Sequence, residues 1–153
     1  MGAFKRRPKR LASFNYRGEH TYYLTFGTWK RVPAFADPTV AATACRVILR
    51  YRNEGRYYLY AYVVMPDHIH VLLKLRKSAG ELSTIVATIK ATIKHDVMEF
   101  TKLNWQPGFH DWIKRDHEES ADFVRYTLSN PVRAGLCKDP SEYPFLGMAD
   151  SWR

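Results

Sequence analysis

Residues 56–75, RYYLYAYVVMPDHIHVLLKL, contain two apolar runs that are separated only by Pro66 and Asp67. Aromatic and β-branched side chains predominate in the first run, and apolar side chains fill most of the second, as is typical of β-strands. We therefore predict two antiparallel neighbouring strands, at 56–65 and 68–75, joined by a very short link.

The segments on either side of this pair alternate between strand-like and helix-like patterns. Residues 21–29 are rich in aromatic and β-branched side chains and predict a first strand, and residues 108–113 predict a shorter one. Apolar residues recur at helical spacing in three other segments, which are 38–53, 80–100 and 118–128. The predicted order of elements is therefore β-α-β-β-α-β-α.

Residues with capping or helix-breaking preferences mark the ends of the predicted helices. Asp37 suits the N-cap of the first helix, and Gly55 suits its C-terminal end. Pro131, after Asn130, is expected to stop the last helix, because proline cannot continue it.

The order of elements fits an α+β fold of the ferredoxin-like kind, with a four-stranded antiparallel sheet and helices packed on one face. We expect a basic arm at residues 1–20, a single domain at 21–148 and a short tail at 149–153. Since this fold hosts many unrelated functions, it does not identify the role of the chain.

Composition favours a nucleic-acid partner. The chain has 153 residues, 46% of them hydrophobic, so it can bury a core. Lys and Arg total 24 against 15 Asp and Glu, a formal net charge of +9, which favours binding to a polyanion. A basic surface without such a partner is the alternative. No long apolar run or signal peptide is present, so we expect a cytoplasmic protein without a membrane span. The two cysteines are not in a C-x-x-C pair, which makes a disulfide framework unexpected.

A pair of histidines opens the second strand of the central pair. Because residues two apart on a strand point to the same face, His68 and His70 are expected to lie side by side, with Ile69, Val71 and Leu73 on the opposite, core face. Two imidazoles at this spacing can bind one metal ion. The alternative is that both histidines only line an exposed face. A metal site would need a third ligand from elsewhere in the chain.

The last predicted helix offers candidates for that ligand and for a nucleophile. Tyr126 and Asn130 are four residues apart and therefore share a helical face. Asn130 carries a carbonyl oxygen, a suitable hard ligand beside two imidazoles. A tyrosine is a poor nucleophile unless a metal or basic residues activate it. The alternative for Tyr126, one of ten tyrosines, is a core aromatic residue.

Three blocks of the sequence, taken in order, resemble a known family. MPDHIHVLL at 65–73, WQPGFHDWIKR at 105–115 and YTLSNPVRAGL at 126–136 are similar to signature blocks of REP-associated tyrosine transposases. These proteins are relatives of the IS200/IS605 transposases in the HUH endonuclease superfamily. The resemblance extends from about Tyr22 to Leu136, which is most of the chain.

The resemblance implies a role for each candidate site residue. His68, His70 and Asn130 would be the metal ligands, with Asn130 at the position where IS200-type enzymes carry a glutamine. Tyr126 would be the nucleophile and form a 5′-phosphotyrosine. The metal would be Mg²⁺ or Mn²⁺, the substrate single-stranded or hairpin DNA, and the protein a monomer or a homodimer. Residues 21–148 would then form the catalytic domain.

Basic and aromatic residues elsewhere are candidates for contact with single-stranded DNA, because cations follow the backbone and aromatic rings stack on unpaired bases. The basic candidates in the arm are Lys5, Arg6, Arg7, Lys9, Arg10 and Arg17, and the others are Tyr16, Trp29, Lys30, Arg31, Lys90, Lys94, Lys114 and Arg115. Outside the arm, each is as easily explained as an ordinary surface or core residue. His110 and His117 lie near the site blocks, and a structural role is an equal alternative for His110.

Two other functions remain open at the level of sequence. One is a non-catalytic binder of structured single-stranded DNA or RNA with a regulatory role. The other is a hydrolase that uses zinc and water and has no need of a tyrosine.

Overall fold

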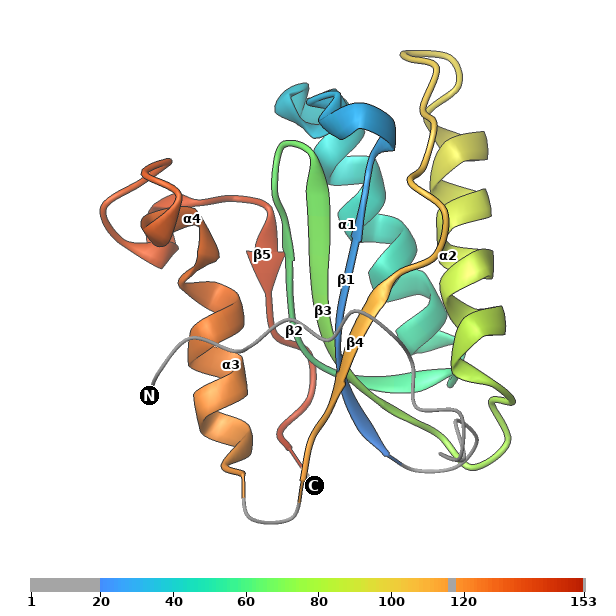
Figure 1. The fold of residues 1–153 in the computed structure, drawn as a ribbon, viewed down its shortest axis with the longest axis vertical. Helices are drawn as coiled ribbons and strands as arrows, with labels where there is room; N and C mark the ends of the chain where they lie inside the picture. The colour runs from blue at the N-terminus through green and yellow to red at the C-terminus, as the bar shows by residue number, and fades with distance from the viewer. Residues whose placement is uncertain (1–19, 116–117, 153) are drawn as a thin grey trace.

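The computed structural model describes residues 20–115 and 118–152. In these ranges five strands form one antiparallel sheet in the order β4-β1-β3-β2-β5 (Figure 1). The strands are β1 (Thr21–Gly27), β2 (Tyr57–Val64), β3 (His68–Leu75), β4 (His110–Ile113) and β5 (Leu146–Gly147). The α-helices in the same ranges are α1 (Pro38–Asn53), α2 (Leu82–Asp96), α3 (Ser120–Leu128) and α4 (Asn130–Arg133). Short 3-10 helices cover Trp29–Arg31, Ala34–Ala36 and Pro140–Glu142.

The predicted central pair of strands is confirmed. β2 and β3 are antiparallel neighbours, with Tyr57 opposite Leu75 and Val64 opposite Ile69. The backbone N–H of Met65 donates to the carbonyl of His68 at 2.8 Å and closes the link. The histidine pair therefore stands where β3 leaves this turn.

The sheet has five strands, so the prediction of four was wrong. The additional strand β5 pairs with the edge of β2, where Leu146 lies opposite Val63. Gly147 allows this close pairing, since a Cβ there would lie 2.8 Å from the Tyr62 hydroxyl and the Tyr62 side chain would have to shift. This strand is two residues long, too short for a pattern of alternating side chains to be recognised in the sequence.

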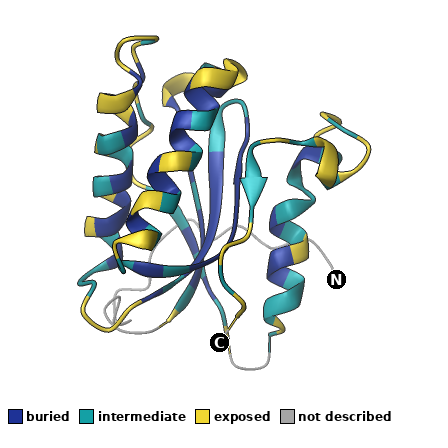
Figure 2. Ribbon diagram, turned by 180° about the vertical axis from the view of Figure 1, so that it is seen from behind, coloured by how far each residue is buried: buried dark blue, intermediate teal, exposed yellow. Residues whose placement is uncertain are grey.

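Helices cover both faces of the sheet, so the prediction that all helices pack on one face was also wrong (Figures 1 and 2). α1 and α2 lie on one face and α3 on the other. The physical reason is that β2 and β3 are apolar on both faces: Leu72 and Tyr60 are as fully buried as Ile69 and Leu73. α3 covers the second apolar face with Phe123 and other side chains.

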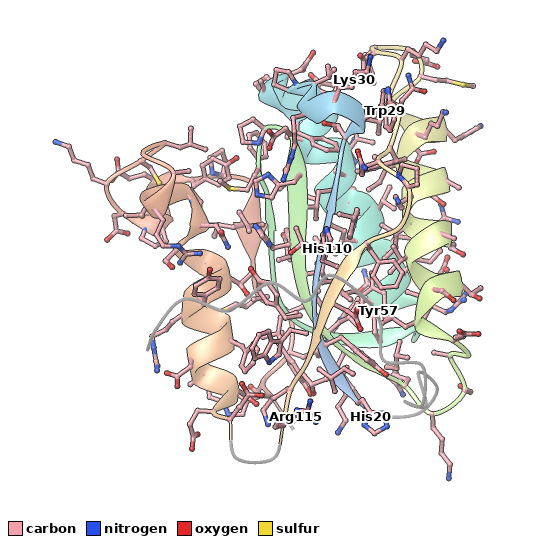
Figure 3. The ribbon with its side chains drawn as sticks, viewed as in Figure 1. His20, Trp29, Lys30, Tyr57, His110 and Arg115 are labelled. Carbon is pink, nitrogen blue, oxygen red and sulfur yellow. The ribbon has the colours of Figure 1, made fainter. Side chains whose placement is uncertain are left out.

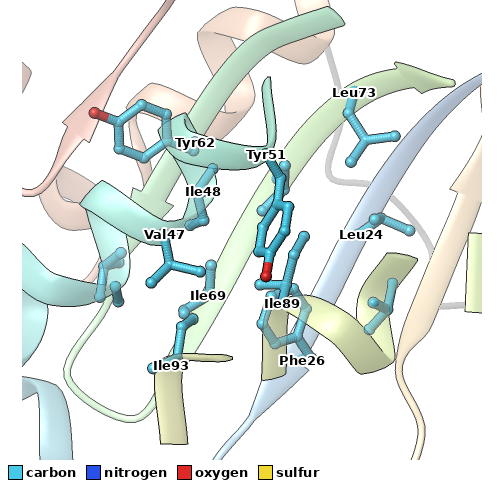
Figure 4. Close-up of a cluster of buried hydrophobic side chains, with 14 of the residues drawn as sticks. Leu24, Phe26, Val47, Ile48, Tyr51, Tyr62, Ile69, Leu73, Ile89 and Ile93 are labelled. Carbon is cyan, nitrogen blue, oxygen red and sulfur yellow. The ribbon is translucent and has the colours of Figure 1, made fainter. Parts of the chain in front are cut away.

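The larger core lies between the sheet and the pair α1 and α2. Figure 4 shows Leu24, Phe26 and Leu73 from the strands among side chains of both helices. Ile69, Val71 and Leu73 are fully buried in this cluster, as the alternation along β3 predicted. The core therefore fixes which face of β3 is left for its two histidines.

The ends of the helices partly follow the prediction. Asp37 caps α1, and its carboxylate accepts a hydrogen bond from the Thr39 backbone N–H at 2.8 Å. Gly55 follows α1 with φ +81°, a conformation that favours glycine. α3 ends at Leu128, but Pro131 does not end helical structure, because it lies in the first turn of α4, where its fixed φ is compatible with a helix. No helix in the described ranges has the length and apolar character needed to cross a membrane.

Candidate active site

The two histidines lie on the face of the sheet that α3 covers. The centroids of the His68 and His70 rings are 4.7 Å apart, and the ring planes are nearly perpendicular. His70 is buried, whereas the His68 side chain retains 21% of its exposure. The prediction that the two side chains share a face therefore holds, but that face is not simply solvent-exposed.

Each histidine is held through its Nδ1 atom. His68 Nδ1 lies 2.5 Å from a carboxylate oxygen of Asp67. His70 Nδ1 lies 2.9 Å from both the Tyr23 hydroxyl and the Thr25 hydroxyl. Partners of this kind fix the orientation and tautomer of metal-binding imidazoles. With Nδ1 engaged, Nε2 is the nitrogen that each ring can offer to a metal ion.

The environment of His70 keeps its imidazole neutral. Burial lowers the pKa of His70 to about 3, and the nearby charges of His68, Arg133 and Arg31 act in the same direction. A neutral imidazole has the lone pair that a metal ion requires. His70 is therefore in the metal-binding form at physiological pH.

This low pKa predicts that the metal-free protein loses stability in acid. The unfolded chain binds a proton at His70 below its ordinary pKa of 6.5, but the folded chain does so only near pH 3. The free energy of unfolding should therefore fall as the pH drops through this window, by on the order of 2–4 kcal/mol. Denaturant unfolding in EDTA at several pH values measures this free energy. The slope of the free energy of unfolding against pH should be smaller in His70→Gln. It should be unchanged in His95→Gln, which removes an exposed histidine, and equal slopes in both variants would contradict the assignment.

Tyr126 reaches the histidines through Tyr23. The Tyr23 ring centroid is 5.5 Å from that of His70 and 5.9 Å from that of Tyr126. Helix α3 carries Tyr126 on the side that packs against Tyr23, because Phe123 and Val124 anchor the helix in the same cluster. The structure thus brings a residue of α3 to the face of the sheet that bears His68 and His70.

Asn130 and Arg133 extend from α4 toward the same place. The Asn130 amide nitrogen donates to the Thr127 carbonyl at 2.9 Å, and the amide oxygen accepts from Arg133 at 2.9 Å. The Asn130 side chain also hydrogen-bonds to Tyr23. The Arg133 guanidinium carbon lies 3.8 Å from the centroid of the Tyr126 ring, a cation–π contact. Tyr126 lies in α3 and Asn130 in α4, with a helix break between them. Both side chains nevertheless contact Tyr23 and lie on the same side of the sheet.

The donor set fits a divalent metal with mixed nitrogen and oxygen ligands. Within residues 20–115 and 118–152, no group of three or more His, Cys, Asp and Glu side chains is arranged to hold a metal ion. Among these described residues, a third protein ligand beside His68 and His70 would therefore be of another type. The Asn130 amide oxygen is a hard donor with two lone pairs, so it can accept from Arg133 and still bind a cation.

Tyr23 is a residue that the sequence reasoning missed, and we predict that it positions the site. Its hydroxyl joins His70 to Asn130, so Tyr23→Phe should weaken metal binding about tenfold without unfolding the chain. Calorimetric titration with Mn²⁺ measures this. Tyr51→Phe is the matched control, because it removes a hydroxyl bonded to Thr92 on the other face of the sheet. Equal Mn²⁺ affinity in both variants would refute the positioning role.

The basic residues proposed to contact DNA lie in several separate places. Lys90 is half-buried, and its ammonium donates to the carbonyls of Gln106 at 2.9 Å and Gly108 at 2.7 Å. Lys94 lies on α2, as Lys90 does, and its ammonium is 3.4 Å from the side-chain oxygen of Asn104. This helix covers the face of the sheet opposite the histidines. In Figure 3, Arg115 lies at the far end of the sheet from Trp29 and Lys30. Lys114 is next to Arg115.

Other candidates lie close to the site or outside the described residues. Arg31 is 3.7 Å from the Asp67 carboxylate that holds His68. His110 lies opposite Thr25 in the sheet. The arm candidates and His117 lie outside the described residues, and these are Lys5, Arg6, Arg7, Lys9, Arg10, Tyr16 and Arg17.

Sequence signals for the missed residues existed but were indirect. Tyr23 and Thr25 are two apart on the first predicted strand, so they share a face, but only the strand pairing shows that this face adjoins His70. Asp67 precedes His68 and lies in the predicted link between the two strands. Arg133 lies inside the block 126–136, but the sequence alone assigns it no role.

Comparison with known proteins is consistent with this geometry. The family model described as "Transposase IS200 like" matches residues 17–116. A REP-associated tyrosine transposase of Escherichia coli K12 is 26% identical over 130 residues, which are 81% of this chain and 78% of that protein. A provisionally named REP-associated tyrosine transposase of Haemophilus influenzae is 25% identical over 97 residues, 56% of this chain and 55% of that protein. A solved REP-associated tyrosine transposase bound to a REP hairpin shares the fold, with a TM-score of 0.72, 23% identity and coverage of 95% and 82% of the two chains.

Proposed function

The chain belongs to the IS200-like transposase family, and from this premise we propose that it cleaves and rejoins single-stranded DNA through a covalent bond to Tyr126. One observation carries the proposal: α3 folds onto the histidine face, and Tyr23 contacts both Tyr126 and His70. Tyr126 and the histidine pair, which are far apart in the sequence, therefore lie on the same face of the sheet, and this supports the proposal.

The proposed reaction exchanges one phosphodiester for another. The Tyr126 oxygen attacks the phosphorus and gives up its phenolic proton, while the bond between phosphorus and the 3′ oxygen of the leaving strand breaks. That oxygen takes up a proton and becomes a free 3′-hydroxyl, and the 5′ phosphate stays on Tyr126. Attack by another 3′-hydroxyl on the phosphotyrosine reverses the step and joins two strands. No energy source is required, because one ester replaces another.

His68, His70 and Asn130 would hold the divalent metal, Mg²⁺ or Mn²⁺. When bound, such an ion polarises the phosphoryl group and offsets charge in the transition state. The neutral His70 ring and the carboxylate behind His68 support this assignment. Tyr23 and Thr25 keep the His70 ring in place during the reaction.

Two guanidinium groups give the site a positive field for a phosphodiester. Arg133, which stacks on Tyr126, and Arg31, from the 3-10 helix after β1, both lower the pKa of His70. A phosphate near the histidines would therefore lie in the positive field of both guanidinium groups. Their place supports a role in binding the scissile phosphate and its neighbour.

The substrate class follows from the relatives. The E. coli relative is named a REP-associated tyrosine transposase, and a solved relative is bound to a REP hairpin. We propose that this chain also acts on single-stranded DNA next to a hairpin of that type.

The decisive experiment is a covalent-adduct assay. The protein is incubated with a labelled REP-type hairpin that carries single-stranded flanks, with Mn²⁺ or with EDTA, and is then denatured and separated by size. We expect a labelled protein band only with metal. Hairpin binding that is unchanged by EDTA, without any adduct, would instead favour a non-catalytic binding protein.

A further inference from the structure

A cavity of about 560 Å³ opens beside the histidines at the end of β1. Its size is within the range of about 300–1,000 Å³ that is typical of small-ligand sites. It is lined by Thr25 to Thr28 at the end of β1, by the paired segment Gln106 to His110 that leads into β4, and by Arg31. We call this cavity the Arg31–His110 pocket. Apart from Thr25 and Arg31, its lining residues have no role in the proposed chemistry at Tyr126.

Backbone hydrogen bonds join the two neighbouring segments that line the pocket. The Gln106 N–H donates to the Gly27 carbonyl at 2.9 Å, and the Trp29 N–H donates to the Asn104 carbonyl at 2.8 Å. From behind, the Lys90 ammonium binds the carbonyls of Gln106 and Gly108. Partial burial desolvates this ammonium and lowers the pKa of Lys90. The two carbonyl contacts offset part of this desolvation. The pocket is therefore formed before a ligand arrives.

Strand pairing places the pocket directly beside His70. Thr25 lies between His70 on β3 and His110 on β4, and residues opposite each other in an antiparallel sheet project to the same face. The Thr25 hydroxyl is 2.9 Å from His70 Nδ1. In Figure 3, Trp29 and Lys30 lie near one end of the sheet and Arg115 near the other, and His110 lies on β4 between them.

The Arg31 side of the pocket depends on an unusual backbone. Lys30 and Arg31 both have positive φ, of 55° and 57°, a conformation that is unfavourable for non-glycine residues. This conformation turns the chain back toward Asp67. A Cβ at Gly27 would lie 3.3 Å from the Asp67 carbonyl oxygen, a tight contact, so glycine favours the close approach of β1 to the link between β2 and β3.

We propose that the Arg31–His110 pocket receives one unpaired nucleotide of the DNA, next to the scissile phosphate; the proposal rests on the function assigned to Tyr126. Gln106 and His110 would contact the edge of the base, since amide and imidazole groups can both donate and accept hydrogen bonds. Arg31 would contact the phosphate that this nucleotide shares with the cleaved bond. The pocket would thus determine which nucleotide stands at the cleavage position.

The test compares binding of hairpins that lack one base at a time. The parent protein is Tyr126→Phe in EDTA, and the probes are REP-type hairpins in which a single flank nucleotide is replaced by an abasic one. We expect about tenfold weaker binding when the nucleotide next to the cleavage position is abasic. His110→Ala and Gln106→Ala in this parent should remove that penalty and keep the affinity for the hairpin stem. His95→Ala, which removes an exposed side chain of α2, should keep the penalty.

Each outcome decides the proposal. A penalty profile that is the same in the parent and in both pocket variants would overturn it, as would a sensitive nucleotide away from the cleaved bond. Thermal unfolding of each variant checks that it is folded. Adduct formation by the unmodified protein tests the proposed function separately: adducts with an unchanged profile overturn only the pocket, whereas a pocket-dependent profile without adducts overturns the cleavage chemistry.

Discussion

Replacing Tyr126 by phenylalanine is expected to abolish the covalent DNA adduct, with a loss of at least about 10³-fold. Phenylalanine keeps the ring that packs against Tyr23 and beneath Arg133 but lacks the oxygen that would attack phosphorus. Hairpin affinity should therefore change by less than about threefold. The measurement is adduct yield against time in Mn²⁺, together with an equilibrium binding curve.

Tyr58→Phe is the matched control for this experiment. Tyr58 packs at the margin of the same cluster as Tyr126, but it lies opposite Lys74, far along the strand from His70. It should form adducts at the normal rate. An adduct that persists in Tyr126→Phe would assign the nucleophile to another residue. Hydrolysis that survives in Tyr126→Phe but not in His68→Ala would indicate a zinc hydrolase that uses water.

Sequence periodicity was sufficient for the centre of the fold because strong patterns coincide there with strong burial. β3 begins and ends at the predicted residues, since its apolar run is bounded by a turn and by charged residues. Periodicity failed where both faces of a strand are buried. Leu72 and Tyr60 were not distinguishable from ordinary strand residues, and only the packing of α3 on them shows a second covered face.

The site was predictable to the extent that local geometry determines it. His68 and His70 share a face by strand periodicity alone. Tyr126 and Asn130 were linked to them by resemblance, because no local rule places a distant helix on a given face. The surrounding residues were missed because their roles depend on pairing: Thr25 adjoins His70 only through the register of β1 with β3.

Lys90 illustrates what charge alone does not reveal. In the sequence it is a basic residue on the polar side of a helix, and its ammonium is a candidate for a phosphate. In the structure that ammonium donates to the carbonyls of Gln106 and Gly108. The distinction depends on a contact between residues 16 to 18 positions apart, which no helical pattern encodes.

Removal of either histidine should abolish adduct formation while leaving hairpin binding nearly unchanged. His68→Ala is the more informative variant, because the side chain is partly exposed and its loss leaves less of a cavity than loss of the buried His70. We expect adduct yield to fall at least about 100-fold in Mn²⁺ and to recover only partly at high metal concentration, since two ligands of the proposed set remain.

His95→Ala, which removes an exposed histidine paired with Asp96, should behave like the unmodified protein. Because Tyr126 keeps its contact with Tyr23 in all three variants, a loss confined to His68→Ala and His70→Ala separates the metal requirement from the nucleophile. Full activity of His68→Ala in Mn²⁺, or equal activity of the unmodified protein in EDTA, would remove the metal from the proposed mechanism.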